Sequence, residues 1–464
     1  MSAVPAKRLE QRAPMENHRG VIAEDYHVLQ SLGSIDAARA AMVAAPGTTE
    51  ALLTGLYQSV EIGLHNLVQL LDRAAVHIRD GEVAAAATEL HWVRGFHRVL
   101  VRLSLAARRV SGGWDAEAPR WTVDATPAFA EFMGALGRFD RELTALADRP
   151  EIDLGAVIAQ RSLDDTWFGV LHCARIANHD ARVWSANLSA SAHPAPELPP
   201  DRVLASEPIR HAVFEHQLRG DTYFTQFRAL HQIPELLIRE INDRVEIAIR
   251  RIRTGETAAA VDALDGAGEL FDPIEACLPP LVDNLSTHDY HQIRENLGLT
   301  SGSHSVSIRF ELFTELYEQL VDAIRQYGDA GGADPLVRRL HRNARDLQVF
   351  IFSWRDMHLH LPRNNLGGME TKSLTGARDA VGTVRKMRDN AASNDPLARI
   401  DRSVPVPTSL AGPLVEYLDG PESSDGLLLG ITGKVTQANF RDVQERTNFF
   451  SQQCPFSRPQ RRVV

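Results

Sequence analysis

Cysteine is scarce in this chain of 464 residues, and its scarcity argues against a disulfide-stabilised or zinc-binding protein. The three cysteines, Cys173, Cys277 and Cys454, are far apart, odd in number and never spaced as CxxC. They therefore predict neither a disulfide framework nor a zinc site. A reducing cytoplasm is the compartment that fits them best.

Long hydrophobic runs and a basic excess are also missing. No run approaches the roughly 20 apolar residues that cross a bilayer, so we expect no membrane partner. Residues 1–20 are polar and mixed in charge, without the apolar core of a secretory signal. The formal net charge of −10, with no basic stripe carrying interleaved aromatics, argues against a nucleic-acid partner.

Strand patterns are scarce, whereas apolar residues at helical spacing recur through the first 390 residues. The sequence therefore predicts an all-α protein. We expect a flexible N-terminus over 1–20, a helical unit over 21–190, a second helical domain over 200–390 and a proline-rich C-terminal arm over 391–464.

An internal repeat links the two helical units. A shift of 174 residues places Tyr57-Gln-Ser-Val-Glu61 on His231-Gln-Ile-Pro-Glu235 without a gap, and Gly81-Glu82 on Gly255-Glu256. Matched glutamine, glutamate and glycine positions favour duplication over shared alanine and leucine content. The first copy has tyrosine where the second has His231, so it is predicted to be the degenerate one.

One histidine of the second unit lies on a helical stripe that is otherwise apolar. In steps of three and four the stripe runs Leu340, Ala344, Leu347, Ile351, Trp354, His358 and Leu361, and we expect the helix to end at Pro362. A buried imidazole needs a partner. The stripe alone leaves two interpretations open: a core histidine bonded to a carbonyl, or a metal ligand such as that of heme iron. His360 points off the stripe.

Two further pairs are spaced i,i+4 on helices. Phe227 and His231 could line an apolar pocket with one polar contact, although His231 could equally bridge two helices. Tyr290 and Arg294 lead into the loop residues Leu299-Thr300-Ser301-Gly302-Ser-His-Ser305. There the arginine could hold a carboxylate or form a surface salt bridge, and Gly302 allows close backbone approach.

These segments together resemble the tryptophan 2,3-dioxygenase family of heme enzymes. The resemblance covers roughly 221–377 and lies in His231-Gln-x-x-Glu-Leu236, in Tyr290-x-x-x-Arg294-Glu and its Ser-Gly loop, and in Trp354-Arg-x-x-His358 followed by Arg363. The family's order of motifs is kept. The resemblance implies an all-α bundle of the tryptophan/indoleamine dioxygenase type that binds heme b and uses dioxygen.

Carried over by motif, the resemblance implies a role for each matched residue. His358 would be the iron ligand and His231 the distal, catalytic histidine. Trp354 and Gly302 would contact the heme. The substrate-binding residues would be Phe227, His231, Tyr290, Arg294, Thr300, Ser301 and Thr371. Arg294 would hold the α-carboxylate, and Thr371, after a one-residue gap, the amino group. A homodimer is one expectation, and the first repeat packing on the second as an internal pseudo-partner is another.

The chain also departs from the family pattern, and the departures favour one branch. Leu237 replaces a tryptophan, Tyr290 replaces a phenylalanine, and the loop after the heme helix runs Thr371-Lys-Ser-Leu-Thr-Gly376. They favour the divergent branch similar to monodechloroaminopyrrolnitrin synthase, which rearranges or monooxygenates an indole-type amino acid. The expected function is a heme-dependent oxygenase of an aromatic amino acid in secondary metabolism. The alternatives are a tryptophan 2,3-dioxygenase giving N-formylkynurenine, a non-catalytic heme-binding protein and a structural helical protein.

Overall fold

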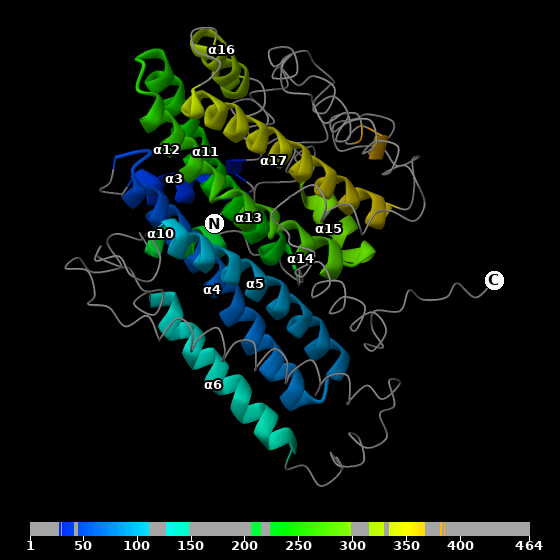
Figure 1. Cartoon of the computed structure of the whole chain (residues 1–464). Coiled ribbons are helices and arrows are strands. Elements are labelled where there is room, and N and C mark those ends of the chain that lie inside the picture. Colours follow the sequence, from blue (N-terminus) through cyan, green and yellow to red (C-terminus); the bar gives the residue numbers. More distant parts are fainter. Residues whose placement is uncertain are drawn as a thin grey trace.

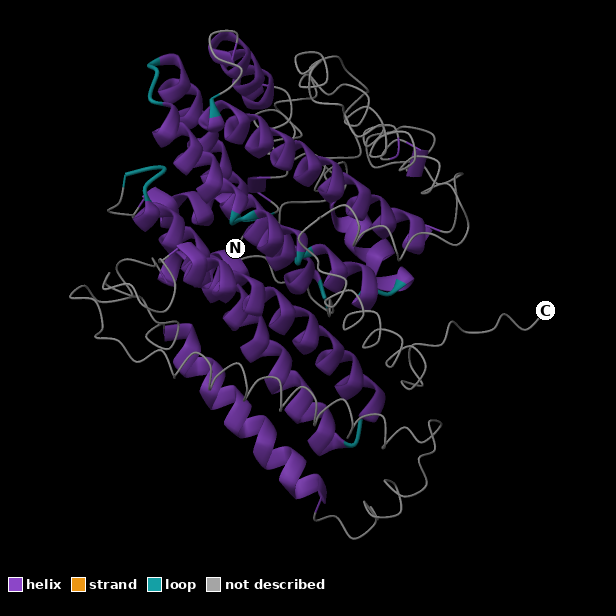
Figure 2. Cartoon of the chain, in the orientation of Figure 1, coloured by secondary structure: helices purple, strands orange, loops and turns teal. Residues whose placement is uncertain are grey.

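A computed structural model gives the fold, and it describes residues 27–28, 30–40, 45–110, 127–147, 206–214, 223–297, 315–328, 334–366, 381–382 and 385. Within these ranges the regular structure is entirely helical, as the sequence predicts (Figures 1 and 2). None of the helices in these ranges is long and apolar enough to cross a membrane.

The described residues of the first half of the chain form four helices. They are α3 (Leu32–Ala40), α4 (Thr49–Asp80), α5 (Val83–Val110) and α6 (Pro127–Ala147). The hydroxyl oxygen of Thr48 accepts a hydrogen bond from the Ala51 N–H at 3.2 Å and so caps the start of α4. Gly81, at a φ of +79°, ends α4. Long α4 packs against both α5 and α6 (Figure 1).

The second half contributes the helices that carry the predicted chemistry. They are α10 (Ser206–Phe214), α11 (Phe224–Arg253), α12 (Thr257–Gly268), α13 (Phe271–Glu275), α14 (Leu278–Asn284), α15 (Thr287–Leu297), α16 (Tyr317–Gly328) and α17 (Pro335–Leu366). Helix α12 packs against both α11 and α17, while α15 lies beside the C-terminal half of α17 (Figure 1).

Helix boundaries in the two halves differ by almost the same number of residues. Adding 174 to the bounds of α3 gives those of α10, and adding it to the first residue of α5 gives that of α12. Gly81 and Gly255, also 174 apart, share a φ of +79°. The side-chain amide of Gln58 donates to the Ala38 carbonyl, and that of Gln232 donates to the Ala212 carbonyl.

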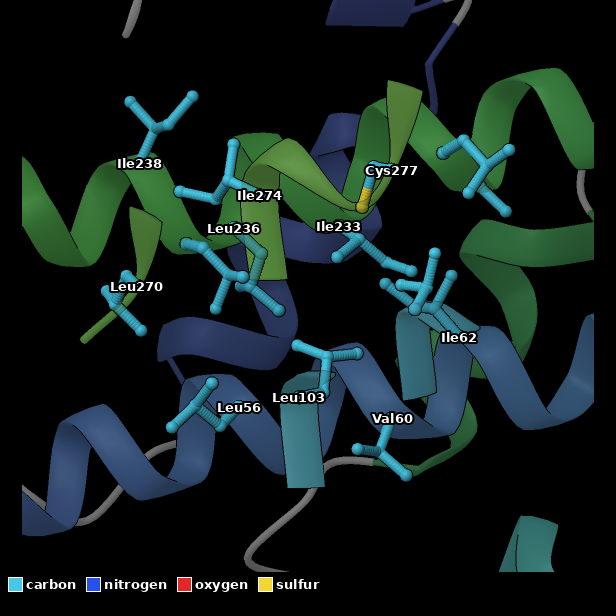
Figure 3. Packing of buried hydrophobic residues seen from close by; sticks show 14 of the residues in the cluster. Leu56, Val60, Ile62, Leu103, Ile233, Leu236, Ile238, Leu270, Ile274 and Cys277 are labelled. Atoms are coloured by element: carbon cyan, nitrogen blue, oxygen red, sulfur yellow. The ribbon is translucent and has the colours of Figure 1, made fainter. Parts of the chain in front are cut away.

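The two halves share one core in which α4 packs along α11. Figure 3 shows Leu56, Val60 and Ile62 of α4 facing Ile233 and Leu236 of α11, with Ile274 of α13 close by. Burying apolar area of this kind contributes roughly 25 cal/mol per Å². It therefore holds together segments more than 150 positions apart in the sequence.

Polar contacts also join the halves. The Arg39 guanidinium lies 3.0 Å from the Glu240 carboxylate and 2.6 Å from that of Asp243, which ties α3 to α11. The Gln226 side chain donates to Gln69 of α4 at 3.2 Å. Because a buried polar group without a partner is costly, these contacts fix how α11 lies on the first half.

The expectation that the helix carrying His358 ends at Pro362 is wrong. Helix α17 continues through Leu366 with Pro362 inside it. A proline removes only one donor, the one that would bond the carbonyl of residue 358. Burial of Leu361 and Asn365, with a 3.0 Å hydrogen bond from the Asn365 amide to the Leu361 carbonyl, holds the last turn in place.

Candidate functional site

His358 lies on α17 where the sequence places it, next to a buried apolar face. The other stripe residues, Leu340, Ala344, Leu347, Ile351, Trp354 and Leu361, are all buried. His358 itself keeps part of its surface accessible, yet its Nδ1 is buried and has no hydrogen-bond partner. The ring is therefore incompletely packed and incompletely hydrogen-bonded.

His231 lies on α11 and is almost completely buried. Its Nδ1 is 2.7 Å from the Phe227 carbonyl oxygen. Because a carbonyl oxygen only accepts, Nδ1 carries the hydrogen and Nε2 keeps its lone pair in the neutral ring. The Phe227 ring lies against the imidazole, with 4.2 Å between the ring centres. The imidazole is therefore oriented by a carbonyl of its own helix and lies against an aromatic ring.

The fold brings the two histidines together. Their ring centres are 6.3 Å apart and their planes are nearly perpendicular, at 89°. The Trp354 ring centre is 6.1 Å from that of His358. Residues from positions 227–231 and 354–358 therefore form one cluster, here called the two-histidine cluster, consisting of Phe227, His231, Trp354 and His358.

Both imidazoles are neutral at physiological pH. Desolvation first, and the nearby His231 and the Arg355 charge after it, together lower the pKa of His358 to about 3. Desolvation also lowers the pKa of His231 to about 4, although its bond to the Phe227 carbonyl acts in the opposite direction. Neutral imidazole is the form that ligates metals, so the donor set fits an iron-containing cofactor such as heme.

Tyr290 and Arg294 lie on α15, which packs against α17. Tyr290 is buried, and Arg294 is partly exposed. Desolvation raises the pKa of the Tyr290 hydroxyl to about 12, while the Arg294 charge opposes that rise. The tyrosine therefore stays protonated and able to donate, beside a permanent cation on the same helix.

Several predicted site residues lie outside the described part of the chain. Thr300, Ser301, Gly302 and Thr371 belong to this group. Among the residues that are described, no three His, Cys, Asp or Glu side chains are arranged to hold a metal ion.

A second histidine on a buried helix face was missed by the sequence reasoning. His65 of α4 is buried, and neither ring nitrogen has a hydrogen-bond partner. The signal was present, because His65 follows Glu61 by one turn in a leucine-rich helix whose inward face is apolar. The same stripe argument that singled out His358 would have found it.

Comparisons of the chain with protein-family models, with curated proteins and with solved structures found no match.

Proposed function

We propose that the chain is a heme-dependent oxygenase that acts on an aromatic amino acid, tryptophan or an indole-type derivative. The observation that carries the proposal is the two-histidine cluster. It places two neutral imidazoles from distant helices 6.3 Å apart, with an aromatic ring beside each. Heme, when bound, would supply dioxygen activation at its iron.

The protein side chains have separate tasks in this proposal. His358 would hold the iron, using a ring that its surroundings keep deprotonated. His231 is fixed by the Phe227 carbonyl, so its Nε2 can accept a hydrogen bond from an indole-type N–H. The Arg294 guanidinium would pair with the substrate carboxylate through a planar, two-pronged contact. Phe227 would provide an apolar surface for the aromatic ring.

The first experiment is the absorption spectrum of the full-length protein purified from cells supplied with iron and 5-aminolevulinate. We expect a Soret band in the wild type and its loss in His358→Ala. His360→Ala is the matched control, because it removes an imidazole two positions away on α17 and should keep the band. A colourless wild type, or an unchanged spectrum in His358→Ala, would contradict the proposal.

The second experiment tests substrate binding and turnover. Arg294→Leu should keep the heme content and weaken tryptophan binding at least tenfold, measured as the tryptophan-dependent shift of the Soret band. An oxygen electrode should detect dioxygen consumption with tryptophan or an indole-type analogue. Heme without any consumption would favour the alternative below.

A non-catalytic heme protein is the second candidate, and the histidine separation favours it. Two imidazoles bound to one metal at about 2 Å each have ring centres about 6 Å apart. The observed 6.3 Å therefore also suits an iron ligated by both histidines. The two candidates differ in spectrum, since bis-imidazole ligation gives a six-coordinate, low-spin iron. In that case His231→Ala would convert the iron to a five-coordinate form.

We also infer that the two halves are copies of one helical unit and that the first acts as an internal pseudo-partner of the second. The offset of 174 between α3 and α10, the matched glycines and the matched glutamine contacts support this inference. Equivalent helices also contact each other, α3 with α10 and α4 with α11, as in a two-fold dimer.

A further inference from the structure

A second cluster of side chains, which shares no residue with the two-histidine cluster, contains a stacked aromatic pair. It consists of Arg73 of α4, Glu89 and Trp92 of α5, and Tyr223, which directly precedes α11. The Trp92 and Tyr223 rings have centres 5.3 Å apart and planes at 19°. Trp92 is fully buried and Tyr223 is 7% exposed. The two aromatic side-chain types that are easiest to oxidise therefore lie in contact inside the protein.

Tyr223 has a proton acceptor, whereas Trp92 has none. The Tyr223 hydroxyl donates to Oε1 of Glu89 at 3.4 Å, a long hydrogen bond within the core. Nε1 of Trp92 is buried, and no residue in the described part of the chain accepts a hydrogen bond from it. An aromatic ring that loses an electron becomes a strong acid, so the radical settles where the proton can leave. In this stacked pair that residue is Tyr223.

Arg73 couples loss of the electron to loss of the proton. Its guanidinium carbon lies 5.8 Å from the centre of the Tyr223 ring. A cation there disfavours a ring that stays positively charged but does not oppose a neutral radical. Both hydrogen bonds that Arg73 donates to Glu89, at 2.9 and 3.1 Å, go to Oε2, so Oε1 faces Tyr223. Burial raises the pKa of Glu89, while the Arg73 charge opposes that rise.

Helix α11 connects this cluster to the two-histidine cluster. Tyr223, Phe227 and His231 are spaced i, i+4 and i+8, so they lie on successive turns. Eight residues span about 12 Å along a helix axis. Electrons tunnel over such a distance between groups of one folded protein. An electron leaving Tyr223 can therefore reach a metal held beside His231.

The cluster belongs to the first repeat alone. The shift of 174 places Ile247, Ala263 and Gly266 at the positions of Arg73, Glu89 and Trp92. None of these three side chains can give up an electron readily or accept a proton. Because the second repeat forms the equivalent helices without the cluster, the helical framework does not require it.

We propose that Tyr223 is a redox-active tyrosine that gives one electron to an oxidised metal centre. Its O–H bond breaks and the proton passes to Oε1 of Glu89. The products are a neutral tyrosyl radical, a neutral Glu89 carboxyl group and a metal centre reduced by one electron. A one-electron reductant and return of the proton restore Tyr223. Where the metal is iron at the two-histidine cluster, the inference rests on the proposed function; the chemistry of Tyr223 itself does not.

The first test places a photo-oxidant beside the cluster in the full-length protein. A ruthenium(II) polypyridyl label is attached through Val76→Cys in a Cys173→Ser, Cys454→Ser background, because Cys277 is buried. Val76 is 41% exposed and lies one turn from Arg73 on α4. A light flash with a cobalt(III) ammine quencher gives ruthenium(III), which takes one electron from the protein. We expect a tyrosyl radical in transient absorption and electron paramagnetic resonance, formed more slowly in heavy water.

Variants of the labelled protein identify the residues. Tyr223→Phe should reduce the tyrosyl signal at least tenfold, and Glu89→Gln should slow its formation at least tenfold. Tyr57→Phe is the matched control, a buried tyrosine about 28 Å along α4 from position 76, and should leave the signal unchanged. Circular dichroism checks that each variant folds. A tyrosyl signal that survives Tyr223→Phe, or unchanged formation in folded Glu89→Gln, would overturn the proposal.

The second test addresses the link to the iron. In heme-loaded protein mixed with hydrogen peroxide, freeze-quench electron paramagnetic resonance should show the same tyrosyl signal. Tyr223→Phe should lose this signal and keep the Soret band. A Soret band without a Tyr223-dependent radical would overturn the link and leave the proposed function standing. A protein without a Soret band would contradict the proposed function, while the ruthenium experiment would still decide the role of Tyr223.

Discussion

Acidification should destabilise this protein partly through His65, and the size of the effect follows from the burial of its ring. The pKa of His65 falls from 6.5 to about 4 on folding, through desolvation first and the Arg210 charge second. Below pH 6.5 the imidazole binds a proton in the unfolded chain, whereas in the folded protein it stays neutral until the pH approaches 4. Stability is therefore lost as the pH falls from about 6.5 to about 4, and this contribution levels off below that.

The magnitude can be estimated from the two pKa values. Each unit between them corresponds to 1.36 kcal/mol, so this one ring contributes a loss of about 3 kcal/mol between pH 7 and pH 4. The charged groups facing His65 are Glu61 on its own helix, Glu131 on α6 and Arg210 on α10. The carboxylates attract a proton on the ring and the arginine repels it, so the net effect follows the desolvation.

The assay is urea unfolding of wild type and His65→Leu, followed by the helical circular dichroism signal at several pH values from 7 to 4. Other titrating groups contribute similarly to both proteins and cancel in the comparison. The free energy of unfolding should fall with acidification by about 3 kcal/mol less in His65→Leu than in wild type. His288→Leu, at an exposed position on α15, controls for simple loss of an imidazole. Parallel pH profiles for wild type and His65→Leu would refute the desolvation argument.

Three glycine substitutions test the local geometry. Gly81→Ala and Gly255→Ala should each lower the free energy of unfolding by about 1 kcal/mol, because both glycines have a φ of +79° and nothing lies within 4 Å of an added Cβ. Urea unfolding measures both costs, and unequal values would argue against equivalent turns. Gly266→Ala should cost about 2 kcal/mol, because the added methyl would overlap the Arg244 guanidinium, which donates to the Thr48 carbonyl at 2.9 Å. A melting temperature at or above that of wild type would show that Arg244 moves aside without loss.

Much of the helical framework was predictable because its signals are local. Apolar residues at helical spacing and Gly-Glu pairs at helix ends act within a few positions along the chain. The offset of 174 could be seen in the sequence because Gln58, Glu61 and Gly81 recur as Gln232, Glu235 and Gly255. The end of α17 was mispredicted at Pro362 because the packing of Leu361 outweighs the one hydrogen bond that a proline removes.

The candidate site divides in a similar way. The stripe of α17 and the i,i+4 spacing of Phe227 and His231 identified which side chains face inward. No local pattern shows that the ring centres of His231 and His358 would lie 6.3 Å apart, since the two residues are 127 positions apart in the sequence. Likewise, the sequence does not show that Glu131 and Arg210 would meet beside His65, because the three residues come from three separate helices, α6, α10 and α4.

The sequence by itself therefore determined the helical class, the inward faces of the long helices and the offset between the two halves. These features depend on side-chain periodicity and turn chemistry within one segment. Only the tertiary structure decided which inward faces meet. The hydrophobic effect is non-directional and does not depend on how far apart two segments lie in the sequence. The partners of His358 and of His65 are therefore set by how α4, α11 and α17 pack.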